Sequence, residues 1–242
     1  MKGLVTICAR GGSKGIPGKN IKIINNKPLI AYSVEMAERL RKHYDLDIFL
    51  STDSDEIKSI VLDLKLPSVN LSYERPEFLA SDNAGKLDAI IDVTNYAEKL
   101  MKCSYDFVAD LDVTSPLRTV EDLTTAIKTL FNDHNALNLF SVSRANRNPY
   151  FNMVEKRSDG YYGLCKEGTF LTRQSAPTVY ELNASFYIFK KKFFDGNYKT
   201  VITDQSLVYE VPHICFDLDH QIDFEFMAFL LENKKLDFEI GN

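Results

Sequence analysis

The sequence predicts an α/β fold built on a doubly wound, mostly parallel sheet. Short apolar runs alternate with amphipathic helical patterns along the chain, and this alternation is typical of parallel strands with helices on both faces. Polar capping residues and acidic first turns stand where several of the helical patterns begin. The 242 residues are also enough for one large domain with a well-buried core.

The predicted strands are short apolar runs of the kind that a parallel sheet buries. They are Gly3–Cys8, Asp47–Ser51, Val69–Ser72, Phe107–Leu111, Leu137–Val142, Ala184–Phe189 and Leu207–Val211. Helices are predicted where apolar residues recur at helical spacing. They are Leu29–Lys42, Asp55–Leu64, Lys86–Met101, Val120–Asn132 and Ile222–Glu232. Ser54 and Thr119 stand directly before two of these helices and are expected to cap them.

One stretch, from about Asn146 to Tyr180, breaks this rhythm. It is rich in Asn, Pro, Gly, Tyr and Arg and has no helical period. We interpret residues 146–182 as an excursion of short strands or loops that leaves the main sheet within a single domain over residues 1–242. Its aromatic residues are expected either to form a local core or to be buried against another subunit.

Composition excludes several classes of partner. The formal net charge of −5 does not suit general binding to nucleic acid or to an anionic membrane. The four cysteines are far apart and form no CxxC pair, so a thiolate metal site and a disulfide framework are both disfavoured. The first apolar run is too short for a secretory signal, and no stretch approaches the roughly 18 apolar residues of a membrane span. We expect a cytoplasmic protein.

The segment after the first strand is the most informative one. From Arg10 to Asn20 it reads RGGSKGIPGKN, with four glycines beside one arginine and two lysines. Glycine lets backbone N–H groups approach a ligand, and the cations neutralise phosphate charge. The segment is neither a Walker A motif nor a GxGxxG fingerprint. We expect a loop that binds a polyphosphate; a solvated turn is the plainer alternative.

Two further polar clusters follow predicted strands. They lie at Ser51–Asp55 and at Asp110–Arg118, which places both at the sheet edge where doubly wound folds bind ligands. Hydroxyl and carboxylate groups there can contact a sugar or a metal. Helix capping is the alternative interpretation of the first cluster, and the second would be a weak signal alone.

A pair of acidic residues lies near the carboxyl end of the chain. Asp217 and Asp219 alternate along an extended segment, so their side chains share one face. Two like charges in this arrangement favour a cation between them, and Mg²⁺ is usually held by one or two carboxylates together with substrate phosphates. An acidic turn next to the last helix is the alternative. Beside a polyphosphate loop, we favour the metal site.

These segments together resemble the acylneuraminate cytidylyltransferases, or CMP-sialic acid synthetases, and the relatives that activate other nine-carbon sugar acids. The first loop matches their pattern Ala-Arg-x-x-Ser-Lys-Gly-x-Pro-x-Lys-Asn between Ala9 and Asn20. The likeness continues in order through Ser51–Ser54, Arg75–Glu77, Leu79–Asp82, Thr114–Arg118, Arg173–Gln174, Asn183–Ala184 and Asp217–Asp219. It spans nearly the whole chain.

The resemblance implies a fold of the nucleotide-diphosphosugar transferase type, with the excursion as a dimerisation arm that also closes the neighbour's sugar site. The implied nucleotide-binding residues are Ala9, Arg10, Gly11, Ser13, Lys14, Lys19, Asn20, Arg75 and Lys86. The implied sugar-site residues are Asp112, Thr114, Ser115, Arg173, Gln174 and Asn183. Asp217 and Asp219 would hold Mg²⁺. The implied partners are CTP, a sugar acid and a second copy of the chain.

The expected reaction is attack of the anomeric hydroxyl of a nonulosonic acid on the α-phosphate of CTP, with release of pyrophosphate. Arg10, Lys19 and Asp219 are the expected catalytic residues, because positioning and charge neutralisation dominate such transfers. Asp219, a water on the metal or Asp112 would take the proton. A cytidylyltransferase for an eight-carbon sugar acid and a non-catalytic nucleotide-binding module remain alternatives.

Two positions depart from the family pattern. Many members have Gln-Pro before the Thr-Ser-Pro-Leu-Arg segment, whereas this chain has Asp112-Val113. A carboxylate cannot donate a hydrogen bond to the sugar acid as an amide can. The family's hydroxyl-rich Asp-x-Ala-Ser segment is represented here by residues 82–86, which end in Gly85-Lys86. These departures favour the branch that activates legionaminic-type bacterial sugars.

Overall fold

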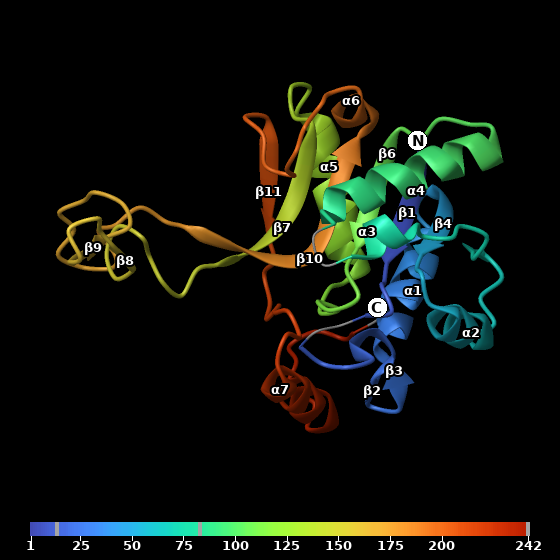
Figure 1. The fold of residues 1–242 in the computed structure, drawn as a ribbon, viewed down its shortest axis with the longest axis horizontal. Coiled ribbons are helices and arrows are strands. Elements are labelled where there is room, and N and C mark those ends of the chain that lie inside the picture. Colours follow the sequence, from blue (N-terminus) through green and yellow to red (C-terminus); the bar gives the residue numbers. More distant parts are fainter. Residues whose placement is uncertain (13–14, 82–83, 241–242) are drawn as a thin grey trace.

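A seven-stranded sheet forms the centre of the molecule (Figure 1). The structure is a computed structural model that describes residues 1–12, 15–81 and 84–240. From edge to edge the strands are β11 (Ser206–Glu210), β7 (Asn138–Arg144), β10 (Tyr180–Lys190), β6 (Phe107–Leu111), β1 (Lys2–Cys8), β4 (Asp45–Ser51) and β5 (Val69–Asn70). Neighbours run parallel except where β10 pairs with β6 and β7. The predicted mostly parallel α/β sheet is confirmed.

Helices cover both faces of the sheet because successive strand residues point to opposite sides. In β1, Val5 and Ile7 enter one core cluster and Leu4 enters the other. The first cluster receives α1 (Leu29–Leu40), α2 (Asp55–Asp63), α5 (Val120–Asn132) and α7 (Gln221–Glu232). The second receives α4 (Lys86–Met101) and the short α6 (Lys191–Phe194). Within the described ranges, no helix combines the length and apolar character needed to cross a membrane.

Both predicted helix caps are present. The Ser54 hydroxyl accepts a hydrogen bond from the Ile57 N–H at 3.3 Å at the start of α2. At the start of α5, Thr119 and Asp122 form a reciprocal capping box, with distances of 3.1 Å and 2.7 Å. Each cap satisfies N–H groups that the first helical turn leaves unpaired. These caps fix where the loops from β4 and β6 end.

Two predicted elements end two residues earlier than expected. The helix predicted over Leu29–Lys42 stops at Leu40, because the chain turns there and the His43 N–H donates to the Leu40 carbonyl. The strand predicted over Val69–Ser72 stops at Asn70. The Asn70 side chain accepts from the Ser72 N–H at 2.8 Å, and this local turn competes with continued strand pairing.

Several short elements had no sequence signal. They are the 3₁₀ turn η1 (Lys19–Ile21), the hairpin of β2 (Ile23–Ile24) and β3 (Lys27–Pro28), α3 (Glu77–Ala80) and α6. Each is too short to show a hydrophobic period. The hairpin turns on Asn25 and Asn26, which have φ of 49° and 61°. Asparagine tolerates this left-handed region, which two-residue hairpin turns require.

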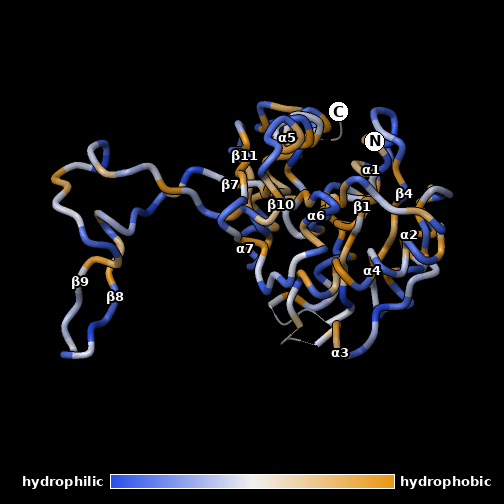
Figure 2. The backbone as a smooth tube through the Cα atoms, turned by 90° about the horizontal axis from the view of Figure 1, so that it is seen from above, coloured by the Kyte–Doolittle hydropathy of each residue, from blue (hydrophilic) through white to orange (hydrophobic). Residues whose placement is uncertain are grey.

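An arm projects from one side of the sheet, away from the remaining elements (Figures 1 and 2). It carries a small hairpin of β8 (Val154–Lys156) and β9 (Tyr162–Leu164), in the segment where short strands or loops were expected. Strands β7 and β10 lead into and out of it. β10 therefore begins at Tyr180, earlier than the predicted Ala184, because it pairs with β7 as far as Arg144.

Candidate active site

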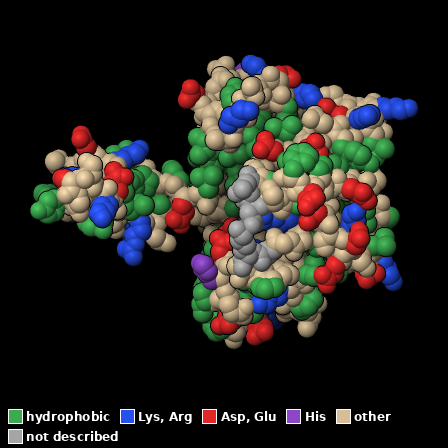
Figure 3. Space-filling view, in the orientation of Figure 1, with side chains coloured by type: hydrophobic (Ala, Val, Ile, Leu, Met, Phe, Trp, Pro, Cys, Tyr) green, Lys and Arg blue, Asp and Glu red, His purple; other side chains and the backbone are tan. Residues whose placement is uncertain are grey.

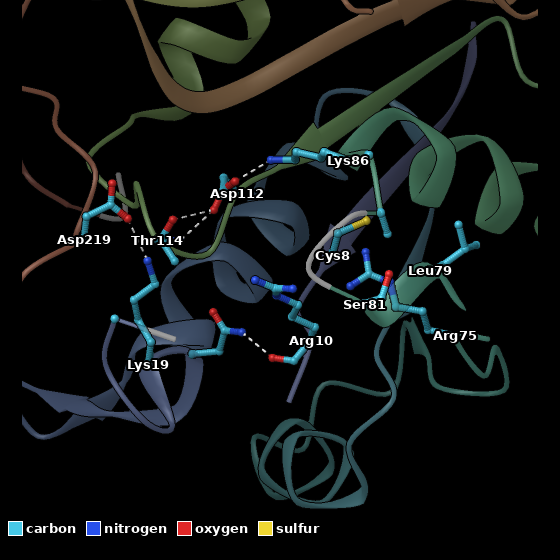
Figure 4. Close-up of a pocket in the computed structure, with 14 residues that line it drawn as sticks. Cys8, Arg10, Lys19, Arg75, Leu79, Ser81, Lys86, Asp112, Thr114 and Asp219 are labelled. Carbon is cyan, nitrogen blue, oxygen red and sulfur yellow. Dashed lines mark hydrogen bonds and ion pairs between the residues drawn. The ribbon is translucent and has the colours of Figure 1, made fainter. Parts of the chain in front are cut away.

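A polar cavity of about 370 Å³ lies at the carboxyl ends of β1 and β6 (Figure 4). Four separate segments of the chain, residues 8–20, 75–86, 112–114 and 219, contribute to its lining. Its lining consists of Cys8, Arg10, Gly15, Lys19, Asn20, Arg75, Leu79, Ser81, Ala84, Gly85, Lys86, Asp112, Thr114 and Asp219. Doubly wound folds bind ligands at this edge. The sequence clusters after the first strand, after β6 and before α7 therefore meet in one place.

The loop after β1 is held in shape by contacts within the sheet edge. The Gly11 N–H donates to the Asp53 carboxylate at 2.8 Å, which ties the loop to the segment after β4. The Asn20 amide donates to the Arg10 carbonyl at 2.9 Å and closes the loop on itself. Gly18 has φ of +64°, a conformation that a side chain would strain. Ser13 and Lys14, two predicted nucleotide-binding residues, lie outside the described residues.

The same loop packs closely against the segment that carries the acidic pair. A Cβ at Gly15 would lie 3.1 Å from the Asp219 carbonyl oxygen. Such an approach is tighter than ordinary packing, so this position favours glycine. Lys19 reaches the same segment, and its Nζ lies 3.0 Å from Asp219 Oδ1. The loop and Asp219 therefore form one continuous wall of the cavity.

Cationic side chains occupy the part of the cavity nearest this loop. Arg10 points into the middle of the cavity in Figure 4, between Lys19 and Arg75. The Arg75 side chain is 9 % exposed, and its Nε is buried without a hydrogen-bond partner among the described residues. A buried guanidinium requires anionic or polar partners. These three side chains have the charge and geometry to bind a phosphate chain.

The acidic pair contributes carboxylate oxygens beside these cations. Asp219 lines the cavity, whereas Asp217 lies deeper, and its Oδ1 is buried without a hydrogen-bond partner among the described residues. Burial raises the pKa of Asp217, and the nearby charges of Asp112 and Asp219 raise it further. No cluster of three or more His, Cys, Asp or Glu suited to a metal occurs in the described ranges. Two carboxylates with phosphate oxygens nevertheless match the donor set of Mg²⁺.

Lys86, at the first position of α4, is enclosed by carboxylates. Its Nζ lies 3.0 Å from Asp110 Oδ2 and also forms an ion pair with Asp112. It stands 4.9 Å from the centre of the Tyr187 ring. Burial on its own would lower the pKa of Lys86, but the two carboxylates raise it above its ordinary value. Burial on its own would raise the pKa of Asp112, but the Lys86 ammonium keeps this pKa below its usual range.

A fully buried arginine holds the loop after β6 in position. Arg118 donates to the backbone carbonyls of Asp112, Ser115 and Ser185, at 2.8, 2.9 and 2.6 Å. It also donates to the Ser33 and Ser185 hydroxyls. Burial lowers its pKa to about 10. The loop that carries Asp112 and Thr114 is thereby joined to α1 and β10.

Four predicted site residues serve the framework around the cavity instead of lining it. Ala9 is buried where its N–H pairs with the Ser51 carbonyl, and Gly11 makes the contact with Asp53 described above. Ser115 is buried and donates to the Phe216 carbonyl at 3.2 Å. Asn183 is also buried and bonds Ser141 and Ser143, which braces the irregular pairing of β10 with β7.

Arg173 and Gln174 lie on the arm and do not meet the cavity of their own chain. They line a separate recess of about 70 Å³ near the base of the arm. The Arg173 guanidinium donates to the Ala145 carbonyl at 3.0 Å. Their predicted sugar-site role therefore depends on a second copy of the chain.

Sequence reasoning assigned no role to several residues at the site. Cys8, Leu79, Ser81, Ala84 and Gly85 line the cavity. Asp110 carried a usable signal, because it alternates with Asp112 along a strand and therefore shares its face. Tyr187 had none, since only the antiparallel pairing of β10 with β6 brings it opposite Asp110.

Comparison with known proteins decides the family. Residues 4–236 match the cytidylyltransferase family. The chain belongs to this family. The predicted resemblance and the prediction of a CTP-dependent nucleotidyltransferase are thus confirmed.

The chain is also similar to individual proteins, in sequence and in fold. The chain is 40 % identical over 235 residues to "Post-translational flagellin modification protein B" of Campylobacter coli, covering 96 % of both chains. It is 39 % identical, with the same coverage, to "CMP-N,N'-diacetyllegionaminic acid synthase" of Campylobacter jejuni. Among solved structures, CMP:2-keto-3-deoxy-manno-octonic acid synthetase complexed with CTP matches with a TM-score of 0.67 at 15 % identity, over 97 % of this chain and 100 % of the other. That likeness supports the fold.

Proposed function

We propose that this cytidylyltransferase transfers CMP from CTP to the anomeric hydroxyl of a nonulosonic acid of the sialic or legionaminic type. One observation carries the proposal: three cations, Arg10, Lys19 and Arg75, share a single cavity with the carboxylate of Asp219, which precedes α7. This arrangement suits a nucleoside triphosphate with a divalent cation. The acceptor class rests on the likeness to the Campylobacter jejuni synthase.

The residues would act by positioning and by neutralising charge. Arg10 and Lys19 would hold the phosphates while the acceptor oxygen forms a bond to the α-phosphorus and the bond to the β-phosphate oxygen breaks. Pyrophosphate is the leaving group and carries the negative charge that develops on its oxygen. The proton of the anomeric hydroxyl passes to a base, and Asp219 is favoured over Asp112 for this role, because the ion pair with Lys86 makes Asp112 a weak base.

The acidic pair would hold the divalent cation. Asp217 and Asp219 supply two oxygen-donor side chains, and the buried unpartnered oxygen of Asp217 is consistent with a ligand at this point. Bound there, Mg²⁺ would offset the charge that develops on the phosphates. Lys19 now pairs with Asp219, so a triphosphate would give Lys19 a new partner beside the cation.

Turnover with a panel of acceptors tests this function. The purified protein would be incubated with CTP, Mg²⁺ and a sialic acid, a diacetylated legionaminic acid or an eight-carbon sugar acid, and pyrophosphate would be measured. We expect release with a nonulosonic acid at least ~10-fold faster in kcat/KM than with the eight-carbon acid, since hydroxyl and acylamino contacts discriminate by this much. Preference for the eight-carbon acid would overturn the acceptor class. CTP binding without pyrophosphate release from any acid would indicate a non-catalytic module.

We also propose that two copies of the chain pair through their arms. Apolar side chains are exposed along the arm, among them Met153, Val154, Tyr161, Tyr162 and Leu171, which is 94 % exposed. Green side chains on this arm are visible in Figure 3. An apolar surface of this kind marks an interface. The partner's arm would bring Arg173 toward the acceptor carboxylate.

The four free cysteines suit a reducing compartment, and we place the enzyme in the cytoplasm, which cell fractionation would check.

Subunit mixing tests the dimer and the shared site together. Arg173→Ala and Asp219→Ala homodimers should each be inactive, or nearly so. After co-refolding them, mixed dimers would contain one site with both residues intact, so activity should return to about a quarter of wild type by random pairing. Sedimentation should show two copies at micromolar concentration. A monomer, or mixtures that stay inactive while wild type refolds fully, would contradict the shared site.

A further inference from the structure

The ammonium group of Lys86 is already paired with two carboxylates. It carries three N–H donors, and its surroundings are the Asp110 carboxylate, the Asp112 carboxylate and the face of the Tyr187 ring. A phosphate at Lys86 would lie beside these two carboxylates, which repel it. The structure therefore argues against the nucleotide-binding role predicted for Lys86.

The charge balance of this cluster leads to the same conclusion. Two carboxylates and one ammonium leave a net charge of −1, and the side chain of Asp110 is fully buried whereas that of Asp112 is 18 % exposed. The surplus negative charge thus faces the cavity at Asp112. Phosphates are repelled from this end and are drawn to Arg10, Lys19 and Arg75, and the acceptor's own carboxylate is repelled from this end as well.

Asp112 still has room for one further donor. Its Oδ1 accepts from the Thr114 N–H at 2.8 Å and from the Thr114 hydroxyl at 2.9 Å. Its Oδ2 accepts from Lys86. A carboxylate has about four acceptor positions, so one remains on Oδ2. In Figure 4, Lys86 and Asp112 point toward each other along one side of the cavity, away from Arg75.

We infer that the Lys86–Asp112 ion pair selects the acceptor by accepting a hydrogen bond from an uncharged donor group, a hydroxyl or an amide N–H, of the sugar acid. This inference rests on the proposed function. Lys86 acts as a positioning residue that keeps Asp112 ionised and fixes its orientation. Thr114 fixes the other carboxylate oxygen. The pair distinguishes sugar acids by the donor that they present at one carbon.

The test compares an accepted nonulosonic acid with analogues that each lack one hydroxyl or acylamino group. For the wild type, we expect one analogue to lose about 10- to 100-fold in kcat/KM, the worth of a hydrogen bond to a charged group. In the double variant Lys86→Met/Asp112→Asn, which removes both charges together, this ratio should fall to within about threefold. The KM for CTP should stay within about threefold, because the phosphates lie elsewhere.

A second ion pair on the same helix provides the matched control. Glu98, near the end of α4, pairs with Lys191 at 2.8 Å and does not line the cavity. The variant Glu98→Gln/Lys191→Met should keep the wild-type selectivity between analogues. It also reports how far loss of any ion pair on α4 lowers thermal stability.

Three results would overturn the inference. Wild-type kcat/KM values within about threefold for every analogue would show that no such donor is selected. Unchanged selectivity in the Lys86→Met/Asp112→Asn variant with a raised Mg²⁺ requirement would make Asp112 a metal ligand instead. Absence of wild-type turnover with every nonulosonic acid would overturn the proposed function and this inference with it, whereas the first two results leave the function intact.

Discussion

Replacing Asp219 by alanine is expected to lower kcat about 10³-fold or more at saturating CTP, acceptor and Mg²⁺. Asp219 is the carboxylate of the acidic pair that lines the cavity, and it also contacts Lys19 at 3.0 Å. Its loss removes a ligand for the divalent cation and the favoured proton acceptor. Binding of CTP without Mg²⁺, measured by calorimetry, should be retained or strengthened, because Lys19 loses a competing anion.

Glu225→Ala is the matched control for this experiment. Glu225 is an exposed carboxylate on α7 that accepts a hydrogen bond from the Gln221 side chain. This variant should keep wild-type kcat. Near-normal turnover of Asp219→Ala at saturating Mg²⁺ would exclude Asp219 as a metal ligand and as the base.

Replacing Arg118 by methionine is expected to destabilise the fold by about 3–5 kcal/mol. The substitution removes the charged donor of the hydrogen bonds to the carbonyls of Asp112, Ser115 and Ser185. Each carbonyl keeps one other donor, namely the Ser33 hydroxyl, the Ser185 hydroxyl and the Asp112 N–H respectively. A hydrogen bond to a charged group contributes roughly 1.5–3 kcal/mol, and loss of several of them at one buried site gives the expected change. Urea unfolding followed by circular dichroism measures the change as a lower transition midpoint. Arg118→Lys should recover part of the loss, because one ammonium cannot reach all of these acceptors.

An exposed arginine provides the comparison. Arg41 makes a surface ion pair with Glu38 at 3.4 Å, and Arg41→Met should change the free energy of unfolding by no more than about 0.5 kcal/mol. A similarly small change for Arg118→Met would show that neighbouring groups or water replace its hydrogen bonds. The loop after β6 would then not depend on this side chain.

Local signals made much of the fold predictable. The bounds of α4 and α5 agree with the prediction at both ends, because their hydrophobic period is long and Thr119 marks the start of α5. β6 also agrees at both ends. The errors fall where tertiary pairing or a side-chain turn sets the boundary, as at Tyr180 and Asn70. Two-residue strands have too few residues to show a period.

The residues of the candidate site also fall into two groups, those that local sequence patterns predict and those that depend on tertiary or quaternary structure. Arg10, Lys19, Asn20 and Asp219 were predictable, because a glycine-rich cationic loop and an alternating acidic pair are patterns within short segments. The structure places all four in one cavity. Arg173 was predicted from resemblance and lies on the arm, outside that cavity. The sugar-site role predicted for Arg173 requires a second copy of the chain.

The sequence by itself determined the fold class, the glycine-rich cationic loop and the family, because each depends on residue types at fixed local spacing. Only the tertiary structure decided what Lys86 does. Asp110, Asp112 and Tyr187 come from β6, the loop after it and β10, and they surround the first residue of α4. These contacts make a lysine expected at the nucleotide the partner of the carboxylate that we propose selects the acceptor, since two carboxylates beside one ammonium repel a phosphate.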